Sequence, residues 1–296
     1  MNQLYSRFAV VEDVRSPEFL SVNRDMSTLS TRFELSDHTE LNAERYPWSV
    51  GMLPKPAFYA ARLWEYPFAI LAADLTPEMK VADIGCGMTA FTIYLKEFAG
   101  CDVTGIDPDI FDEGTKYFAH GVSQDFIKRT GLRILKGDFE GIPLESDSQD
   151  RVFSISVMEH VAPDTRRRGI QEIARILKPG GRAVITVDVS MVGFELNRPL
   201  DLIWDSGLTL LEPIDLRWPT RRFGMFSESQ LPADVFGVTL VKENREVETR
   251  YRYGDERVET VAAHRVPTLI PRPSIGERPL WRRVGGRLKR EIRKVI

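Results

Sequence analysis

The chain has 296 residues, of which 43% are hydrophobic and 28% are charged, so it is long enough to bury a sizeable core and matches neither a disordered nor a fibrous protein. Its 40 Lys and Arg against 43 Asp and Glu give a net charge of −3, which excludes a protein that binds polyanions over its whole surface. Two cysteines, Cys86 and Cys101, are too few for a disulfide framework and favour a reducing compartment.

The first 75 residues are predicted to form an N-terminal arm and a covering helix. Residues 1–50 are polar without a clear period, which predicts an irregular arm with one helix. Residues 56–74 are rich in alanine and large apolar residues and predict a helix that is interrupted or kinked at Pro67. The alternative to a ligand contact is a purely structural function for that helix, as an amphipathic segment that packs Trp64 and Phe68 on a sheet.

From residue 80 onward, short apolar runs alternate with segments of helical length. The runs predict strands at residues 80–84, 102–106, 133–135, 151–157 and 182–187. The segments between them predict helices at residues 89–98, 110–128 and 165–177. Strands and helices that alternate in this way form a parallel sheet covered on both faces, so the predicted class is α/β.

The alternation ends after residue 189. Residues 190–226 are rich in Trp and Arg and too long for a plain connection, which favours a lid-like insertion. A strand is expected at residues 238–241, followed by an antiparallel hairpin at residues 250–261 that turns at Gly254 and Asp255. Residues 266–296 read as a Pro-rich linker followed by a basic amphipathic helix.

The richest motif lies at the end of the first predicted strand of the alternating region. Gly85 and Gly87 allow a tight turn and close approach of a ligand. The segment also satisfies G-x-G-x-x-A, with Asp107 twenty residues past Gly87, so a nicotinamide-dependent oxidoreductase is one hypothesis. Asp83 argues against it, because a carboxylate beside the turn would repel a pyrophosphate and suits a cationic ligand.

Five motifs in order resemble the class I S-adenosylmethionine-dependent methyltransferases, with a methyltransferase domain of type 11. They are Asp83–Gly87, Gly105–Asp107, Gly137–Asp138 with Ile142–Leu144, Met158–Val161 and Leu177–Gly181. The resemblance implies a doubly wound, Rossmann-like, mostly parallel seven-stranded sheet with helices on both faces and an antiparallel final strand. The methyltransferase domain is then expected to span residues 76–265.

The resemblance also implies a site for S-adenosyl-L-methionine, with S-adenosyl-L-homocysteine as product. Asp83 and the Gly85–Gly87 backbone would face its methionine portion, and Asp107 would bind its ribose hydroxyls. The remaining expected cofactor contacts follow the strand ends or lie in the covering helix: Cys86, through its backbone and small size, Thr89, Pro108, Asp138, Phe139 (backbone and ring), Ser156, Val157, Tyr59, Arg62 and Glu65.

His160 is the candidate catalytic base, because it follows the fourth strand and an imidazole titrates near neutrality. The alternative is a packing or hydrogen-bonding histidine. Lys178–Gly181 is expected to form a turn rather than a contact. No His, Cys or Asp cluster has metal-ligand spacing, so a metal site is not expected.

The acceptor hypotheses rest on residues 281–296, which hold seven basic residues and one acidic residue, and on the lid-like insertion. The basic helix suits an anionic membrane surface, and packing on protein is the alternative. The leading prediction is O-methylation of a sugar or lipid-linked glycan, with a small secondary metabolite as the rival. Nucleic acid is disfavoured, and a silent cofactor-binding module remains an alternative. The absence of a signal peptide or an apolar span predicts a cytoplasmic protein, peripheral at the inner face of the membrane.

Overall fold

The computed structural model describes residues 6–35, 61–111, 121–190, 206–211, 214–215, 225–226, 232–243, 248–253 and 256–262. Predictions for Tyr59, for residues 281–296 and for most of residues 190–226 therefore fall outside the described residues. Within the described ranges, no helix is long and apolar enough to cross a membrane.

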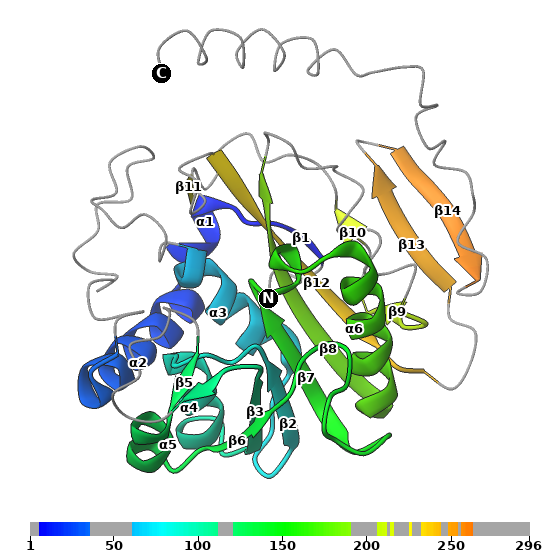
Figure 1. Ribbon diagram of the computed structural model, residues 1–296. Helices are drawn as coiled ribbons and strands as arrows, with labels where there is room; N and C mark the ends of the chain where they lie inside the picture. Colours follow the sequence, from blue (N-terminus) through cyan, green and yellow to red (C-terminus); the bar gives the residue numbers. More distant parts are fainter. Residues whose placement is uncertain are drawn as a thin grey trace, which may run out of the picture.

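Five parallel strands form the centre of the main sheet (Figure 1). Their spatial order is β8 (Leu177–Ser190), β7 (Gln149–Ile155), β2 (Lys80–Ile84), β3 (Asp102–Asp107) and β6 (Arg133–Lys136). The chain starts at the middle of this set and runs outward first through β3 and β6 and then through β7 and β8. The strand order thus switches direction between β2 and β7, where ligands bind beyond the carboxyl ends of the strands.

The sheet extends beyond the seven strands that were expected. β12 (Pro232–Val241) pairs antiparallel with β8, as predicted for a late strand. Twelve strands join the sheet among the described residues, because four short or late strands continue it past β12 and two more, β9 and β11, also pair with β12. The additional strands are β1 (Arg7–Phe8), β9 (Thr209–Leu210), β10 (Ile214–Asp215), β11 (Met225–Phe226), β13 (Glu248–Tyr253) and β14 (Glu256–Ala262).

Helices cover both faces of the central strands, which confirms the α/β class. On one side lie α1 (Val11–Val14), α2 (Pro17–Phe33), α3 (Arg62–Ala73) and α4 (Ala90–Glu97), and α6 (Pro163–Ile176) lies on the other. Each strand contributes side chains to both faces of the sheet, because neighbouring residues point to opposite faces. Val81 and Phe153 join the cluster of α2, α3 and α4, whereas Ala82 and Val152 join that of α6.

Two helix predictions are wrong in part. α3 runs through Pro67 without interruption. The proline has no N–H to donate to the Leu63 carbonyl oxygen, and the Asn23 side chain donates to that oxygen instead. Among the described residues of the range 110–128, helix α5 (Gln124–Thr130) begins at Gln124, because the hydroxyl of Ser123 caps it by accepting from Phe126 N at 3.1 Å. Ahead of it, β4 (Ile110–Phe111) and β5 (Val122–Ser123) form a small parallel sheet.

The expected turn at Lys178–Gly181 lies inside β8 as an irregularity. β7 advances from Gln149 to Arg151 while β8 advances from Leu177 to Arg182, so the intervening residues bulge out of the ladder. Gly180 adopts a φ of +80° there. The hairpin expected near residues 250–261 is confirmed by the antiparallel pairing of β13 with β14.

The predicted packing function of the covering helix is confirmed for its aromatic residues. The Trp64 and Phe68 rings are stacked at 4.5 Å and both side chains are fully buried. Phe68 lies directly on Gly237 of β12, where an added Cβ would come within 2.4 Å of the ring. Glycine at this position therefore lets α3 approach the sheet closely.

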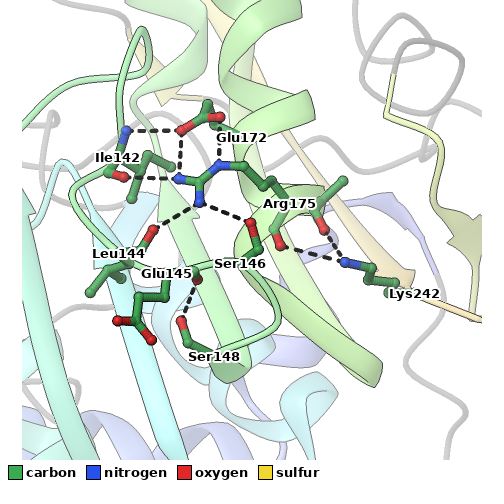
Figure 2. A network of polar contacts seen from close by, with 9 residues as sticks. Ile142, Leu144, Glu145, Ser146, Ser148, Glu172, Arg175 and Lys242 are labelled. Atoms are coloured by element: carbon green, nitrogen blue, oxygen red, sulfur yellow. Dashed lines mark hydrogen bonds and ion pairs between the residues drawn. The ribbon is translucent and has the colours of Figure 1, made fainter.

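A polar network holds the end of α6 to the loop before β7 (Figure 2). The Arg175 guanidinium is bound by the Glu172 carboxylate and donates to the carbonyl oxygens of Ile142 and Leu144, at 2.9 and 2.8 Å. Lys242 donates to the carbonyl oxygens of Ala174 and Leu177, both at 2.8 Å. Lys242 thus satisfies the Ala174 carbonyl, which lies in the last turn of α6 where helical donors are missing. Arg175 instead fixes the loop through its Ile142 and Leu144 carbonyls.

Candidate functional site

A glycine turn connects the carboxyl end of β2 to α4. Gly85 and Gly87 have φ values of +75° and +52°, the region that favours glycine. The turn leans on the neighbouring strand, because Gly85 N and Cys86 N both donate to the carbonyl oxygen of Ile106, at 2.8 and 3.2 Å. A Cβ at Gly85 would lie 2.6 Å from a methyl group of Val157, so the turn admits no larger residue at this position.

Asp107 is held beside this turn, at the tip of β3. One carboxylate oxygen accepts from Gly87 N at 3.0 Å and the other accepts from Asp109 N at 2.9 Å. The side chain is buried. Two backbone donors thus fix the orientation of this carboxylate beside the glycine turn, and a carboxylate is a hydrogen-bond acceptor of the kind that binds hydroxyl groups.

Asp83 is the second buried carboxyl group at the same edge. Its Oδ2 accepts a hydrogen bond of 2.6 Å from the Thr92 hydroxyl, on the first turns of α4. Burial raises the pKa of Asp83 to about 7; the Thr92 hydrogen bond opposes this, and the nearby Asp107 charge adds to it. A carboxyl group poised in this way is stabilised in its charged form by a cation. The site therefore favours a ligand with a positively charged group.

Ser156 and Val157 follow β7 across the switch point. Ser156 has a φ of +51°, and its amide donates to the carbonyl oxygen of Thr186 at 3.0 Å. Its hydroxyl donates to Glu65 Oε1 at 2.6 Å. The structure thus brings Ser156, Val157 and the glycine turn together, as the sequence predicted for its strand-end residues.

Glu65 and Arg62 lie where α3 crosses the ends of β7 and β8. The Glu65 side chain is fully buried, and it forms an ion pair with Arg62. Its Oε1 also accepts from Thr186 at 2.6 Å. The Glu65 carboxylate thus binds groups of its own chain, whereas it was predicted as a cofactor contact.

The small residues around the turn have backbone or local functions. Cys86 is buried, and burial raises the pKa of its thiol well above the usual value. That agrees with a contribution from its backbone only. Thr89 donates to the carbonyl oxygen of Cys86 at 3.3 Å, and Pro108 is exposed directly after Asp107.

Asp138 and Phe139 are placed less favourably than expected. The Asp138 carboxylate accepts from Glu140 N at 2.8 Å and closes a local turn. The Phe139 ring is buried against Gly169 of α6, where an added Cβ would lie 2.5 Å from it. The ring thus belongs to the apolar cluster under α6, and the expected contact of Phe139 with the cofactor stays a prediction.

His160 is exposed at the end of a short 3-10 helix, η2 (Met158–His160), three residues after Val157. Its amide donates to the carbonyl oxygen of Val157 at 3.0 Å, which ties it to the strand end. In the part of the chain that the structure describes, no three His, Cys, Asp or Glu side chains gather as a metal site.

Two residues of the site were missed by sequence reasoning. Thr92 donates to Asp83, and Thr186 donates to Glu65. The sequence offers a weak indication for Thr92, because it is a polar residue between the apolar residues Phe91 and Ile93 of α4. It offers none for Thr186, since a threonine in an apolar strand is common.

A parallel sheet with a glycine turn at its switch point, flanked by two buried carboxyl groups, defines a cofactor-binding α/β domain. Similarity to known protein families indicates which kind of domain this is. Residues 82–185 match the family model described as a methyltransferase domain. Over these residues the chain is thus similar to the methyltransferase domains.

Relatives share this domain over part of their length. A sterol 24-C-methyltransferase of Gibberella zeae is 33% identical over 112 residues, which is 36% of this chain and 27% of the relative. A chloroplastic 2-methyl-6-phytyl-1,4-hydroquinone methyltransferase of Arabidopsis thaliana is 34% identical over 139 residues, 46% of this chain and 38% of the relative. A tRNA (carboxymethyluridine(34)-5-O)-methyltransferase of the same plant is 24% identical over 196 residues, 60% of this chain and 44% of the relative.

The chain thus spans less than half of the length of these three relatives. Among solved structures, a phosphoethanolamine N-methyltransferase of Haemonchus contortus superposes with a TM-score of 0.46 at 16% identity. That match covers 60% of this chain and 52% of the other.

Proposed function

We propose that this protein transfers a methyl group from S-adenosylmethionine to an acceptor. The observation that carries the proposal is the pair of buried carboxyl groups, Asp83 and Asp107, on either side of the glycine turn. A ligand with an ammonium group and a ribose matches both, because a cation stabilises the charged form of the first and the second is a carboxylate that can accept hydrogen bonds from hydroxyl groups. A pyrophosphate, as in a nicotinamide cofactor, would bring negative charge to the two carboxyl groups.

The residues present fit this cofactor. Asp83 would hold its ammonium group, and Asp107 would accept from its ribose hydroxyls. When bound, the cofactor supplies a methyl group that is already activated on a sulfonium. The chain therefore needs to orient the acceptor and exclude water, and to remove a proton if the acceptor is a hydroxyl. His160, at the same edge of the sheet, is the residue proposed to take that proton.

Calorimetric titration with S-adenosylhomocysteine tests the binding half of the proposal. Wild-type protein should bind, and Asp107→Asn should bind about tenfold or more weakly, since it loses a charge-assisted hydrogen bond of roughly 1.5–3 kcal/mol. NAD serves as the competing ligand in the same experiment. Binding of NAD without binding of S-adenosylhomocysteine would overturn the proposal.

For the acceptor, we propose an oxygen nucleophile on a sugar or lipid-linked glycan. Two features support it: the Trp- and Arg-rich composition of residues 190–226 and the basic, amphipathic pattern of residues 281–296, which suits the inner surface of a membrane.

Incubation of native extract, membranes included, with S-adenosylmethionine labelled in its methyl group identifies the acceptor. Label in a glycolipid supports the proposal. Label in a sterol or quinol retains methyl transfer and refutes the glycan, and label in RNA would assign the activity to the class of the tRNA relative.

A further inference from the structure

A closed polar network joins α3 to the ends of β7 and β8. The Ser156 amide lies 3.3 Å from Thr186 Oγ1, the Thr186 hydroxyl donates to Glu65 Oε1, and the Ser156 hydroxyl donates to the same oxygen. All three side chains are buried. Arg62 pairs with the second carboxylate oxygen of Glu65. One carboxylate thus binds two strands and its own helix at a single point.

The carboxylate is not placed to meet a ligand. It has no exposed surface, and both of its oxygens are occupied by donors from the chain. Burying a carboxylate costs free energy of desolvation, and the hydrogen-bond and charge partners of the carboxylate must offset that cost. Its action on the site must therefore pass through the residues that it binds.

Ser156 is the residue through which it acts. Ser156 holds a φ of +51°, a backbone region that residues with a side chain rarely adopt. The next residue, Val157, presses on Gly85, with its methyl carbon 2.6 Å from where a Cβ would be. The conformation of Ser156 therefore sets the position of the side chain that packs on the glycine turn.

We propose that Glu65 is a positioning residue: by binding the Ser156 and Thr186 hydroxyls it holds Ser156 in its left-handed conformation and Val157 against Gly85, and so preorganises the turn that takes the cofactor. This inference rests on the proposed function for the identity of the ligand. The arrangement of the turn in the absence of ligand does not depend on that function.

The test compares substitutions that keep or remove the hydrogen bonds. Glu65→Met removes the acceptor of both hydroxyls, whereas Glu65→Gln keeps a carbonyl oxygen that can accept both. Thr186→Val removes one hydroxyl at nearly constant shape. Arg175→Met is the control, because it loses partly buried polar contacts at the far end of α6, outside the site.

We expect Glu65→Met to weaken binding of S-adenosylhomocysteine by about tenfold, Thr186→Val to weaken it by less, and Glu65→Gln to restore binding to within about threefold of wild type. Arg175→Met should lower the stability to urea and leave the affinity unchanged. A purely structural function of Glu65 would give the same pattern as Arg175→Met, which would overturn the proposal. If Glu65→Met does not fold, an unchanged affinity of Thr186→Val overturns it.

Hydrogen exchange without ligand separates failure of this inference from failure of the proposed function. The amides of Ser156 and Gly87 should exchange faster in Glu65→Met and Thr186→Val than in wild type, and at the wild-type rate in Arg175→Met. If wild-type protein binds no S-adenosylhomocysteine, the proposed function fails while faster exchange still supports the positioning by Glu65. Unchanged exchange of both amides in the two site variants would overturn it.

Discussion

The side-chain amide of Asn23, in α2, donates a 2.9 Å hydrogen bond to the main-chain carbonyl oxygen of Leu63, in α3. In a regular helix that carbonyl would receive the amide of residue 67, but residue 67 is a proline and has no N–H. Asn23 and Leu63 are both fully buried, so water cannot supply the donor. Asn23 thus explains how α3 continues through Pro67.

We expect Asn23→Ala to lower the free energy of unfolding by about 1–3 kcal/mol, because it leaves the buried Leu63 carbonyl without that donor. Pro67→Ala restores the helical donor, so Asn23→Ala should cost about 1 kcal/mol less in the Pro67→Ala background. Urea unfolding of the four proteins measures this coupling. Additive effects of the two substitutions would show that Asn23 does not replace the missing N–H.

The pH dependence of stability should carry a signature of Asp83. A carboxyl group with a pKa of about 7 in the folded protein, against 3.8 ordinarily, stabilises the fold while it is protonated. Its contribution is complete below about pH 4 and is lost as the pH rises through 7. In urea unfolding between pH 5 and 8, Asp83→Asn should remove this decline; parallel curves for the two proteins would contradict the assignment.

Binding of S-adenosylhomocysteine should have the opposite pH dependence. The ammonium group of the ligand favours ionised Asp83, so binding releases a proton, and the affinity rises between pH 6 and 8. The nearby charge of Asp107 adds to the rise in the pKa of Asp83, whereas the Cys86 thiol stays uncharged over this range because burial raises its own pKa. Calorimetry in two buffers of different ionisation enthalpy counts the released proton, and Asp83→Asn should abolish it.

Ser156 should be less tolerant of alanine than of glycine. Both substitutions remove the hydroxyl that binds Glu65, but only alanine keeps a Cβ at a φ of +51°. Ser156→Gly should therefore be more stable than Ser156→Ala by about 1 kcal/mol, the reverse of the usual order in regular structure. Thermal unfolding of both variants checks this, and the usual order would indicate that the backbone relaxes.

His160→Gln tests the proposed base. With a hydroxyl acceptor, turnover should fall by about 100-fold, since a general base contributes roughly that or more, while the affinity for S-adenosylhomocysteine stays unchanged. The measurement is transfer of label to the acceptor identified from the extract. Undiminished turnover would return His160 to a packing or hydrogen-bonding function.

Lys242 is expected to stabilise the end of α6. It donates to the carbonyl oxygens of Ala174 and Leu177 and pairs with Asp147 at 2.7 Å. Lys242→Met should cost about 1–2 kcal/mol in urea unfolding. Lys178→Met, which breaks an ion pair of 2.8 Å with Asp150, is the control and should cost less than about 1 kcal/mol.

Local sequence patterns determined the site's framework. The strand at residues 80–84 is found with the predicted bounds, and the glycine turn and the two aspartates follow their strands as expected. These features are predictable because an apolar run, a glycine with positive φ and a polar residue at a strand end each depend on neighbours within a few residues. Residues 110–111 and 122–123 were mispredicted for the same reason: the apolar spacing around them suits a helix, but they form strands and the Ser123 cap decides where α5 begins.

What the tertiary structure alone decided are the contacts between residues far apart in the chain. Glu65 meets Ser156 and Thr186 across 91 and 121 residues, Asn23 meets Leu63 across 40, and β1 lies between β10 and β12. No local preference specifies such partners. Each buried polar group needs a donor or an acceptor, but which residue supplies it depends on how helices and strands pack, and that is settled only when the whole core forms.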